Sequence, residues 1–526
     1  MSSRQLTELP IGNEMRSFEE GTAAQRHIRS SGVLLVGRVF AVGLNFASQV
    51  VLVRYLSRSS FGAFSYALAV VSFVQGFATF EMTSALARWV PIYRERRQPD
   101  ALYGSVVMAF GFVILTGLVI ASGIVLTLRF VDVPRIDPES SRLLIILAVL
   151  IPIQSLDALV TSIFAILGDT RTIVIRGSII APALRVVLVA VLVLAGAGIE
   201  TLAYGYLLIS GVGLVYYAYA LWRAAVSRDL LKDVRSRTLT YPVRDIFGFA
   251  SPLVVTVLVW SLIESSDTLL LGYFHGVGDV AAFRAVLPLA QLNRIVVMAF
   301  QAMYLPAASR LFARDDRQGL SALYWQTAMW MAVLSFPLFV CTFSFATPTA
   351  AALYGTRYLD SAPILSILSL GYFFNTALGF NGLTLKTFNK VRITVGIDIA
   401  AVVLNIALNL VLIPRWAAVG AAVGTCVTLI VHNLLKQIGL RRFTSVPGMS
   451  RPYLHVYGIL FGIPCLLLLA QRALPSSLWV ALTLSAIGSL IILWVARAHL
   501  AVATTFPELE RWAWWRLARR TFSSAH

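Results

Sequence analysis

Apolar runs of about twenty residues recur about fourteen times along this chain, and short polar segments separate them. Twenty helical residues cover the ~30 Å hydrocarbon core of a bilayer. With 58% hydrophobic and 13% charged residues, the chain is also too apolar for a soluble globular protein. These features predict an all-α polytopic membrane protein. We place its transmembrane helices near residues 32–53, 61–84, 102–127, 143–167, 173–195, 201–222, 247–272, 281–304, 321–345, 361–384, 393–413, 417–435, 454–471 and 477–496.

The lysines and arginines indicate how these helices are oriented. If both termini are cytoplasmic, the segments on that side hold 31 of the 43 basic residues and the opposite side holds 9. The remaining three, Arg38, Arg185 and Arg294, lie in helix interiors, away from the helix ends that are counted with the loops. Cytoplasmic loops carry this excess of basic residues in membrane proteins. With an odd number of helices, basic-rich and basic-poor loops would no longer alternate between the two sides, so the distribution favours fourteen helices. The cytoplasmic excess also explains the net charge of +18 without a nucleic-acid partner.

Weak internal similarity indicates a duplicated unit of six helices. Tyr55 in VRYLSRSSFGAFSYAL matches Tyr273 in LGYFHGVGDVAAFRAV, 218 positions later, and Gly205 matches Gly424, 219 positions later. Six is an even number, so both copies share one orientation in the membrane. They should relate by an axis along the membrane normal, with any substrate path between them.

The domain organisation follows from the apolar runs and the repeat. Neither residues 1–30 nor residues 498–526 hold a long apolar run, and residues 1–30 show no signal peptide. We expect residues 498–526, which are rich in Trp and Arg, to form an amphipathic helix lying in the cytoplasmic interface. The expected parts are a cytoplasmic tail (1–30), an N-lobe (31–222), a basic cytoplasmic linker (223–245), a C-lobe (246–440), two further helices (453–497) and a basic cytoplasmic tail (498–526).

Polar side chains form stripes inside several of the apolar runs. A charged side chain at mid-bilayer costs about 2.5–3.5 kcal/mol, so it should face protein or a hydrated cavity instead of lipid. Spacings of 7, 3 and 7 within the run near 281–304, and of 7 and 4 within the first run, place such residues on one helix face. The candidate substrate-binding residues are Arg38, Asn45, Gln49, Arg185, Arg284, Gln291, Arg294 and Gln301.

Carboxylates within the helices are candidates for coupling or gating. They can titrate or bind Na⁺, and the sequence does not choose between these roles. Glu264 and Asp267 can instead pair with Arg284 to lock an outer gate, and Asp398 can pair with nearby Arg392. The four candidates are Asp157, Glu264, Asp267 and Asp398.

Simpler explanations stay open for some of these residues. Arg38 and Arg284 lie near helix ends, where long side chains can reach the interface. Asn405 and Asn409 share one helix face and can serve as interhelical hydrogen-bonding groups. Arg294 and Arg185 lie too deep to reach the interface easily, so they are the strongest indication of a hydrated central cavity.

The residue types in the stripes indicate what such a cavity would bind. Arginine presents a planar fork of donors that matches phosphate oxygens. Asparagine and glutamine suit sugar hydroxyls. A cationic, polar lumen therefore favours a large anionic glycolipid head group over an organic cation, with the lipid tail left in the bilayer.

The stretch LNIALNLVLIPRWAAVGAAVGT, from Leu404 to Thr425, reads as two helices joined by a very short turn at the Ile-Pro pair. Small residues after the turn let the helices pack closely. The stretch resembles the penultimate core hairpin of polysaccharide and oligosaccharide flippases, which belong to the multidrug/oligosaccharidyl-lipid/polysaccharide exporter superfamily. Ala417 and Ala418 depart from the glycine usual after the Ile-Pro pair. The first two runs, with FGAFSYAL, and ALARWVPIYRER are also similar to that family.

The resemblance implies two six-helix lobes with two extra helices in a bacterial inner membrane. It implies a transporter that flips polyprenyl-pyrophosphate-linked oligosaccharide by alternating access for the synthesis of exopolysaccharide, capsule or O-antigen. The expected partners are lipid-linked oligosaccharide and membrane lipids, with a polysaccharide polymerase and chain-length or co-export proteins as further candidates.

Three alternatives stay open: a multidrug/cation antiporter of the same superfamily, a flippase for peptidoglycan lipid precursors, and a membrane enzyme. An enzyme is not expected, because His275 stands alone in a short outside loop. No Walker-type glycine loop is present. The three cysteines lie in separate apolar runs, so no disulfide framework, metal site or cofactor is expected.

Overall fold

The computed structural model describes residues 37–131, 136–227, 239–444, 446, 451–471 and 477–500, and in this part of the chain the regular elements are all helices. The predicted all-helical class is therefore confirmed. The expected tail at 1–30, residues 228–238 of the linker at 223–245 and most of the tail at 498–526 lie outside the described residues.

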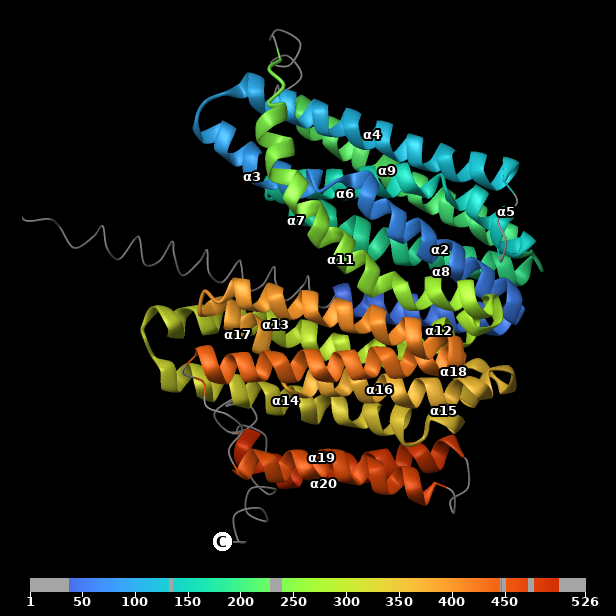
Figure 1. The fold of residues 1–526 in the computed structure, drawn as a ribbon, viewed down its shortest axis with the longest axis vertical. Helices are drawn as coiled ribbons and strands as arrows, with labels where there is room; N and C mark the ends of the chain where they lie inside the picture. The colour runs from blue at the N-terminus through green and yellow to red at the C-terminus, as the bar shows by residue number, and fades with distance from the viewer. Residues whose placement is uncertain are drawn as a thin grey trace, which may run out of the picture.

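The N-terminal half forms one bundle, which we call the N-lobe (Figure 1). Ser57 caps the second helix, its hydroxyl accepting a hydrogen bond from the backbone N–H of Ser60. The N-lobe comprises a helix over residues 37–55, α2 (Arg58–Thr79), α3 (Met82–Glu95), α4 (Pro99–Phe130), α5 (Pro138–Leu147), α6 (Leu150–Ile166), α7 (Thr170–Val174), the π-helix η1 (Ile175–Ile180), α8 (Ala181–Leu194) and α9 (Ile199–Ser227).

The C-terminal half forms a second bundle, the C-lobe, against which the last two helices lie as a separate layer (Figure 1). It comprises α11 (Val243–His275), α12 (Val277–Ala290), the 3₁₀ turn η2 (Gln291–Asn293), α13 (Arg294–Ala313), α14 (Arg317–Phe343), α15 (Ala346–Tyr354), η3 (Thr356–Ser361), α16 (Ala362–Ala377), α17 (Asn381–Thr387) and α18 (Val391–Phe443). The outer layer comprises α19 (Arg451–Ala470) and α20 (Leu478–Leu500).

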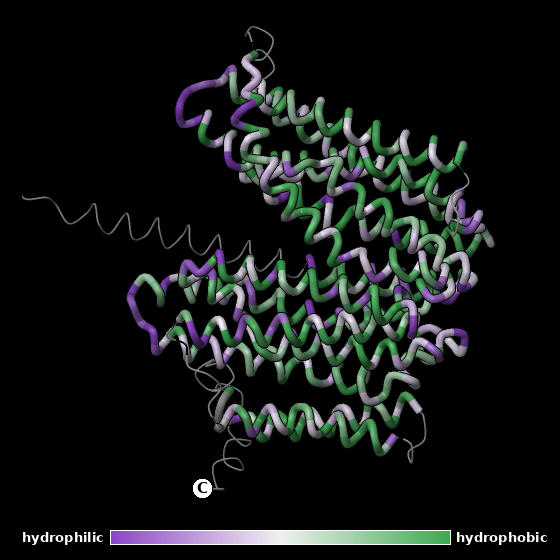
Figure 2. Tube along the Cα trace, viewed as in Figure 1, coloured by the Kyte–Doolittle hydropathy of each residue, from purple (hydrophilic) through white to green (hydrophobic). Residues whose placement is uncertain are grey.

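Hydrophobic residues run along the helices, and hydrophilic residues gather at two opposite ends of the molecule, as expected for a chain that spans a membrane (Figure 2). Ten helices among the described residues are long and apolar enough to cross a bilayer, or twelve if each of two bent helix pairs is one span. The predicted number of fourteen stays a prediction, because the helix at 37–55 adjoins undescribed residues and α18 is one element containing a backbone reversal.

The reversal in α18 forms the hairpin expected from the sequence. Ala417 adopts φ 48° and ψ −130°, so the chain turns back immediately after Pro414 and Trp416. A Cβ on Gly420 would overlap the carbonyl of Leu412, which shows how closely the two halves of the hairpin approach. A left-handed conformation is strained for alanine, and glycine would adopt it freely.

The internal repeat is visible in the backbone. Left-handed residues recur at corresponding turns of the two lobes: Gly196 has φ 62° and Ala417, 221 positions later, has φ 48°. Arg97 and Asp315, 218 positions apart, have φ 55° and 53°. The same turns therefore serve both halves, which agrees with a duplicated unit.

At the end of the molecule where α2 begins, side chains of each lobe bind backbone carbonyls of the other lobe. Arg54 Nε donates to the carbonyl of Leu353 at 2.7 Å, and Arg357 Nη1 donates to the carbonyl of Leu56 at 2.7 Å. A Cβ on Gly62 would overlap the carbonyl oxygen of Val277, so α2 packs against the C-lobe at backbone distance.

An ion pair reinforces this end of the interface. Arg58 Nη2 lies 2.5 Å from Asp360 Oδ2, and Arg58 Nε donates to the carbonyl of Gly278 at 3.1 Å. The Arg58 guanidinium also lies 5.8 Å from the ring centroid of Tyr358. We call this end the closed end.

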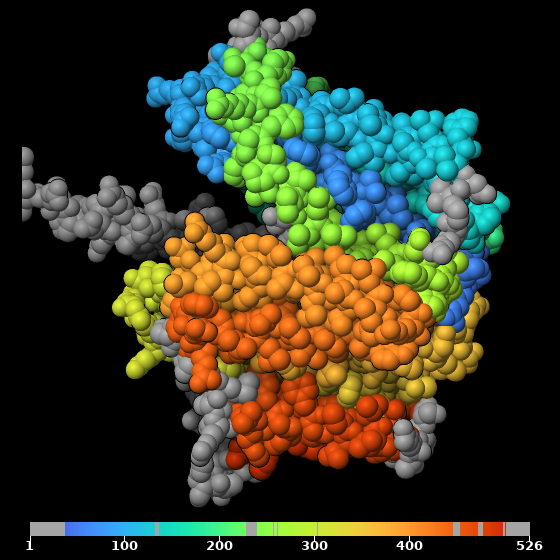
Figure 3. Space-filling model, in the orientation of Figure 1, coloured from blue at the N-terminus to red at the C-terminus, as the bar shows by residue number. Residues whose placement is uncertain are grey.

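The opposite end is hollowed. Figure 3 shows a recess between α3 and the first part of α11 on one side and α18, in orange, on the other. The turns between α3 and α4 and between α17 and α18 lie at this open end (Figure 1). The lobes therefore meet at the closed end and diverge toward the open end.

The strained alanine in the α18 hairpin gives a test of the fold. We expect Ala417→Gly to raise the free energy of unfolding by about 1 kcal/mol, because glycine relieves the left-handed strain. Ala418→Gly is the matched control and should lower stability, because Ala418 is helical and buried. Thermal unfolding in detergent measures both, and a less stable Ala417→Gly protein would contradict the strain.

The ion pair at the closed end gives a second test. We expect Arg58→Ala or Asp360→Ala to open this end more often, raising maleimide labelling of Ser361→Cys in a cysteine-free background by about fivefold. Ser361 is fully buried in the closed state. Arg142→Ala serves as control, because Arg142 pairs with Glu200 within the N-lobe. Equal labelling in all variants would show that the ion pair does not hold this end shut.

Candidate functional site

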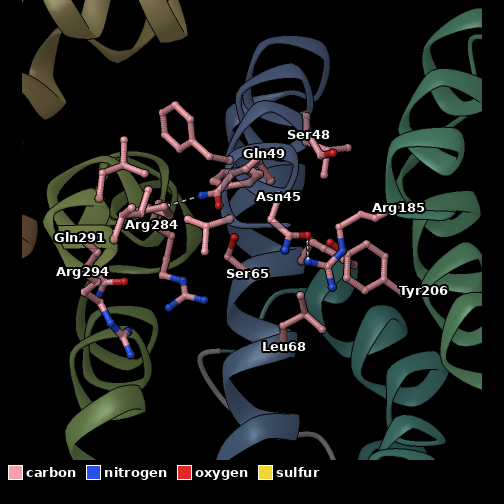
Figure 4. Close-up of a pocket in the computed structure, with 18 of the residues that line it drawn as sticks. Asn45, Ser48, Gln49, Ser65, Leu68, Arg185, Tyr206, Arg284, Gln291 and Arg294 are labelled. Carbon is pink, nitrogen blue, oxygen red and sulfur yellow. Dashed lines mark hydrogen bonds between the residues drawn. The ribbon is translucent and has the colours of Figure 1, made fainter. Parts of the chain in front are cut away.

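A cavity of about 370 Å³ lies between the two lobes, lined by the helix at 37–55, α2, α8, α9 and α12–α13 (Figure 4). Arg185 comes from the N-lobe, and Arg284 and Arg294 come from the C-lobe. The residues that line it include these three arginines and no aspartate or glutamate. The lining therefore carries a net positive charge inside the membrane-spanning part of the chain.

Arg185 is held in a fixed orientation on α8. Its Nη1 donates to Asn45 Oδ1 at 2.8 Å, and its guanidinium lies 5.2 Å from the ring centroid of Tyr206. Its Nε is buried and has no hydrogen-bond partner. A guanidinium fixed by an amide and a ring, with a donor left over, is prepared to bind an anion.

Arg284 is placed by a proline. Pro288 lacks the N–H that would bind the carbonyl four residues earlier, which is the carbonyl of Arg284. Gln49 Nε2 donates to that carbonyl at 3.0 Å, so a side chain of the first helix replaces the missing backbone donor across the lobe interface (Figure 4). The wall of the cavity therefore depends on a contact between the lobes.

The guanidinium groups of Arg284 and Arg294 form no ion pair within the part of the chain that the structure describes. The 3₁₀ turn at Gln291–Asn293 joins their two helices, and both side chains reach toward the same space (Figure 4). Arg294 is exposed and Arg284 is half-buried, so both guanidinium groups are available to an anion that enters the cavity.

Six of the eight predicted substrate-binding residues line this cavity together, and two do not. Arg38 and Gln301 are exposed and line neither this cavity nor the one described next. Both continue the predicted helix faces, beyond the length that the cavity covers. The six lining residues are Asn45, Gln49, Arg185, Arg284, Gln291 and Arg294.

A second cavity, of about 540 Å³, is lined mainly by the C-lobe, with Ala69 and Ser72 of α2 contributing from the N-lobe, and it shares Arg284, Gln291 and Arg294 with the first. We call it the C-lobe cavity. Its lining contains carboxylates, amides and hydroxyls, including those of Glu264 and Asp398. The side chain of Gln291 donates to the hydroxyl of Tyr372 at 2.8 Å. One helix wall therefore separates an arginine-lined cavity from a cavity rich in acceptors.

Asp267 is buried at the edge of this second cavity, and polar groups of α18 bind it. Thr425 Oγ1 donates to its Oδ2 at 2.8 Å, and Asn409 Nδ2 donates to its Oδ1. Asn409 also donates to Asn405, so both asparagines belong to this network. The alternative pairing of Asp267 with Arg284 is not among the ion pairs of the described residues, and Asn409 and Thr425 bind this carboxylate. Glu264 is exposed on the cavity wall.

Asp398 has partners different from the one the sequence suggested. Its Oδ1 lies 2.7 Å from His432 Nε2 and 2.9 Å from Lys436 Nζ, and not in an ion pair with Arg392. His432 and Lys436 were missed because they lie more than thirty positions away. The sequence does hold a signal for this pairing. If the chain turns back at Ala417, positions near 432–436 come opposite position 398.

Asp157 lies apart from both cavities, within the N-lobe. It forms an ion pair of 2.9 Å with Arg176, whose guanidinium lies 5.7 Å from the ring centroid of Tyr217. Arg176 belongs to the π-helix, and the absence of a side chain at Gly213 leaves room for it. Arg176 was not among the candidate residues, and this pair was not predicted from the sequence.

The fold and the cavity define a class: a polytopic transporter with two helical lobes around a cationic cavity. The chain matches the family described as "Polysaccharide biosynthesis protein" over residues 51–363, more than half of its length. It belongs to that family. The resemblance stated from the sequence motifs is thereby confirmed.

Curated relatives agree with this assignment. The chain is 22% identical over 425 residues to the "Probable low-salt glycan biosynthesis flippase Agl15" of Haloferax volcanii, covering 80% of this chain and 84% of the relative. It is 24% identical over 343 residues to the "Succinoglycan biosynthesis transport protein ExoT" of Rhizobium meliloti, covering 65% of each.

Solved structures share the fold. The lipid II flippase MurJ in an inward closed conformation matches with a TM-score of 0.63 and 14% identity, over 91% of this chain and all of that one. An inward-facing multidrug resistance MATE family transporter of the MOP superfamily matches with a TM-score of 0.58 and 16% identity, over 76% and 93%. At these identities the likeness concerns the fold alone.

The orientation of Arg185 gives a prediction about anion binding. We expect Tyr206→Leu to weaken binding of inorganic pyrophosphate by about fivefold, because the guanidinium loses the ring on which it rests. Tyr206→Phe keeps the ring and should bind within about twofold of wild type. Calorimetry on the purified protein measures both, and equal loss in the two variants would assign the effect to the hydroxyl instead.

Proposed function

We propose that this protein is a flippase that moves polyprenyl-pyrophosphate-linked oligosaccharide repeat units across the cytoplasmic membrane for surface polysaccharide synthesis, by alternating access. The observation that carries the proposal is the charge of the cavity between the lobes, which is lined by Arg185, Arg284 and Arg294 and by no carboxylate. Family membership and the names of the relatives agree with it.

The chemistry of the cargo fits this cavity. A pyrophosphate group carries several negative charges that two or three arginines can bind through paired N–H donors. Amides such as Asn45 and Gln49 add neutral donors beside them. The polyprenyl tail needs no polar cavity and stays in the lipid. The protein then supplies a passage for the head group alone.

The open end faces the cytoplasm in this proposal, with both termini on that side of the inner membrane. Basic residues gather at the turns of the open end, among them Arg97, Arg314 and Lys390. Cytoplasmic loops carry such an excess. The conformation described here is then the one that loads cargo from inside.

Release to the other side requires the closed end to part. The contacts of Arg54, Arg58 and Arg357 with the opposite lobe would break, and the lobes would meet near the cytoplasm instead. The break between α2 and α3, where Phe80 and Glu81 are left-handed, offers a site where the N-lobe can bend. Each of these contacts contributes little free energy on its own, so they can break and form again as the gate opens and closes.

The helix carboxylates are assigned to coupling or gating. Asp267, bound by Asn409 and Thr425, is the best placed to exchange a proton or a Na⁺ ion, because it is buried beside the cavity. Glu264 and Asp398 line the same cavity. Asp157, paired with Arg176, would contribute within the N-lobe.

A multidrug/cation antiporter is the alternative of a different substrate class. An organic cation would be repelled by three arginines in a cavity without carboxylates. A flippase for peptidoglycan precursors would carry an equally anionic cargo, so charge does not separate it from the proposal.

Transport in both cases requires no covalent chemistry on the cargo, and we assign the protein no enzymatic activity. Its partners would be the lipid-linked oligosaccharide and membrane lipids, with a polymerase and co-export proteins downstream.

The substitution Arg294→Ala tests the proposal. We expect it to abolish export of surface polysaccharide while the protein still inserts in the membrane, because a cation at the centre of the pathway is lost. Arg310→Ala is the matched control: Arg310 lies on the same helix, is exposed and lines neither cavity. Normal export by Arg294→Ala would remove α13 from the substrate path.

Deletion of the gene separates the alternatives. Loss of surface polymer with lipid-linked repeat units retained inside supports the proposed flippase. Intact polymer with new sensitivity to cationic drugs indicates the antiporter. Rescue of a strain depleted of its peptidoglycan-precursor flippase indicates that substrate instead, and missing lipid-linked repeat units indicate an enzyme upstream.

A further inference from the structure

The C-lobe cavity is adjacent to the cavity between the lobes and shares part of its wall. Arg284, Gln291 and Arg294 line both. A phosphate bound to either arginine is therefore next to both cavities. Whatever group is attached to that phosphate can enter the C-lobe cavity without leaving the binding site.

The C-lobe cavity holds polar atoms that lack partners. Asn293 is 2% exposed and Thr428 is 9% exposed, and both line the cavity. Asn293 Oδ1 and Thr428 Oγ1 are buried and have no hydrogen-bond partner. Buried polar atoms of native proteins are almost always hydrogen-bonded, so these two call for a ligand that supplies donors. They come from η2 and from the second half of α18, two elements far apart in the sequence.

The two cavities differ in their charged residues. The C-lobe cavity adds Glu264, Asp267 and Asp398 to the two shared arginines, with Asp398 bound by His432 and Lys436, whereas the cavity between the lobes has no carboxylate. Its volume of about 540 Å³ lies in the range of pockets that bind small molecules. A group rich in hydroxyls, without negative charge, is the match for such a lining.

We propose that the C-lobe cavity is the subsite for the sugar attached to the pyrophosphate, and that it selects a neutral or amino sugar over an acidic one. The phosphates lie on the arginines of the cavity between the lobes, and the sugar hydroxyls donate to Asn293 Oδ1 and Thr428 Oγ1. The carboxylates of the cavity repel a uronic acid. This subsite rests on the proposed function and adds the part of the cargo on which its specificity depends.

The test is a binding measurement on the full-length purified protein in nanodiscs with three probes. The first is a polyprenyl pyrophosphate bearing one N-acetylglucosamine, the second is the same lipid without sugar, and the third bears glucuronic acid. We expect the wild-type protein to bind the first probe about tenfold more tightly than the other two. Thr428→Val and Asn293→Leu should each lose most of this preference and bind the sugar-free lipid as wild type does.

Two controls make the result specific. Thr342→Val removes a buried hydroxyl of the C-lobe that bonds within its own helix and lines neither cavity, so it should keep the preference. Arg185→Gln should weaken all three probes alike, because Arg185 lines only the phosphate cavity.

The outcomes separate the two proposals. If Arg185→Gln binds every probe as wild type does, the proposed function fails. If Arg185→Gln weakens all probes but Thr428→Val and Asn293→Leu keep the full preference for the sugar, the subsite is overturned and the function stands. Equal affinity of the wild-type protein for the three probes, or an equal loss for all probes in the two variants, also overturns the subsite.

Discussion

Polar groups in a membrane must be satisfied inside the protein, because the hydrocarbon core offers them no water. The clearest example is the carbonyl of Arg284, which Pro288 leaves without its helical partner and which Gln49 binds from the first helix. That one contact fixes the wall of the cavity and ties it to the opposite lobe. A movement of the lobes that breaks this contact would leave the Arg284 carbonyl in need of another donor.

The same requirement separates charges that have partners inside the protein from charges available to an anionic ligand. Asp398 is bound by His432 and Lys436, and Asp267 by neighbouring polar side chains. Arg284 and Arg294 have no ion-pair partner among the described residues, although they lie at the centre of the molecule. Unpaired cations beside paired carboxylates favour binding of an anion over binding of a cation.

The two ends of the lobe interface differ in the strength of their contacts, and this asymmetry makes transport possible. The closed end has backbone carbonyls bound by arginines and one ion pair, while the open end is hollowed (Figure 3). The hydrogen bonds are exposed or half-buried, so each contributes little alone. Buried apolar residues of both lobes, among them Phe61, Phe64 and Phe283, also pack in one cluster, so parting the lobes must break apolar contacts as well as these polar ones.

The sequence by itself determined the helical class and the polar faces, and it predicts an orientation in the membrane. Hydrophobic length and the helical period act locally, so they can be predicted without neighbours. The repeat was also visible, and the turns at Gly196 and Ala417 show it in the backbone. Six of eight candidate residues line the cavity because helical spacing predicts which face a residue occupies.

Only the tertiary structure decided which faces meet. Spacing places Arg38 and Gln301 on polar faces but does not say where the cavity ends, and both lie outside it. Periodicity likewise gave no partner for Asp398, because His432 reaches it only after the chain turns back. The choice of partners depends on the packing of helices distant in sequence, and a local pattern carries no information about that packing.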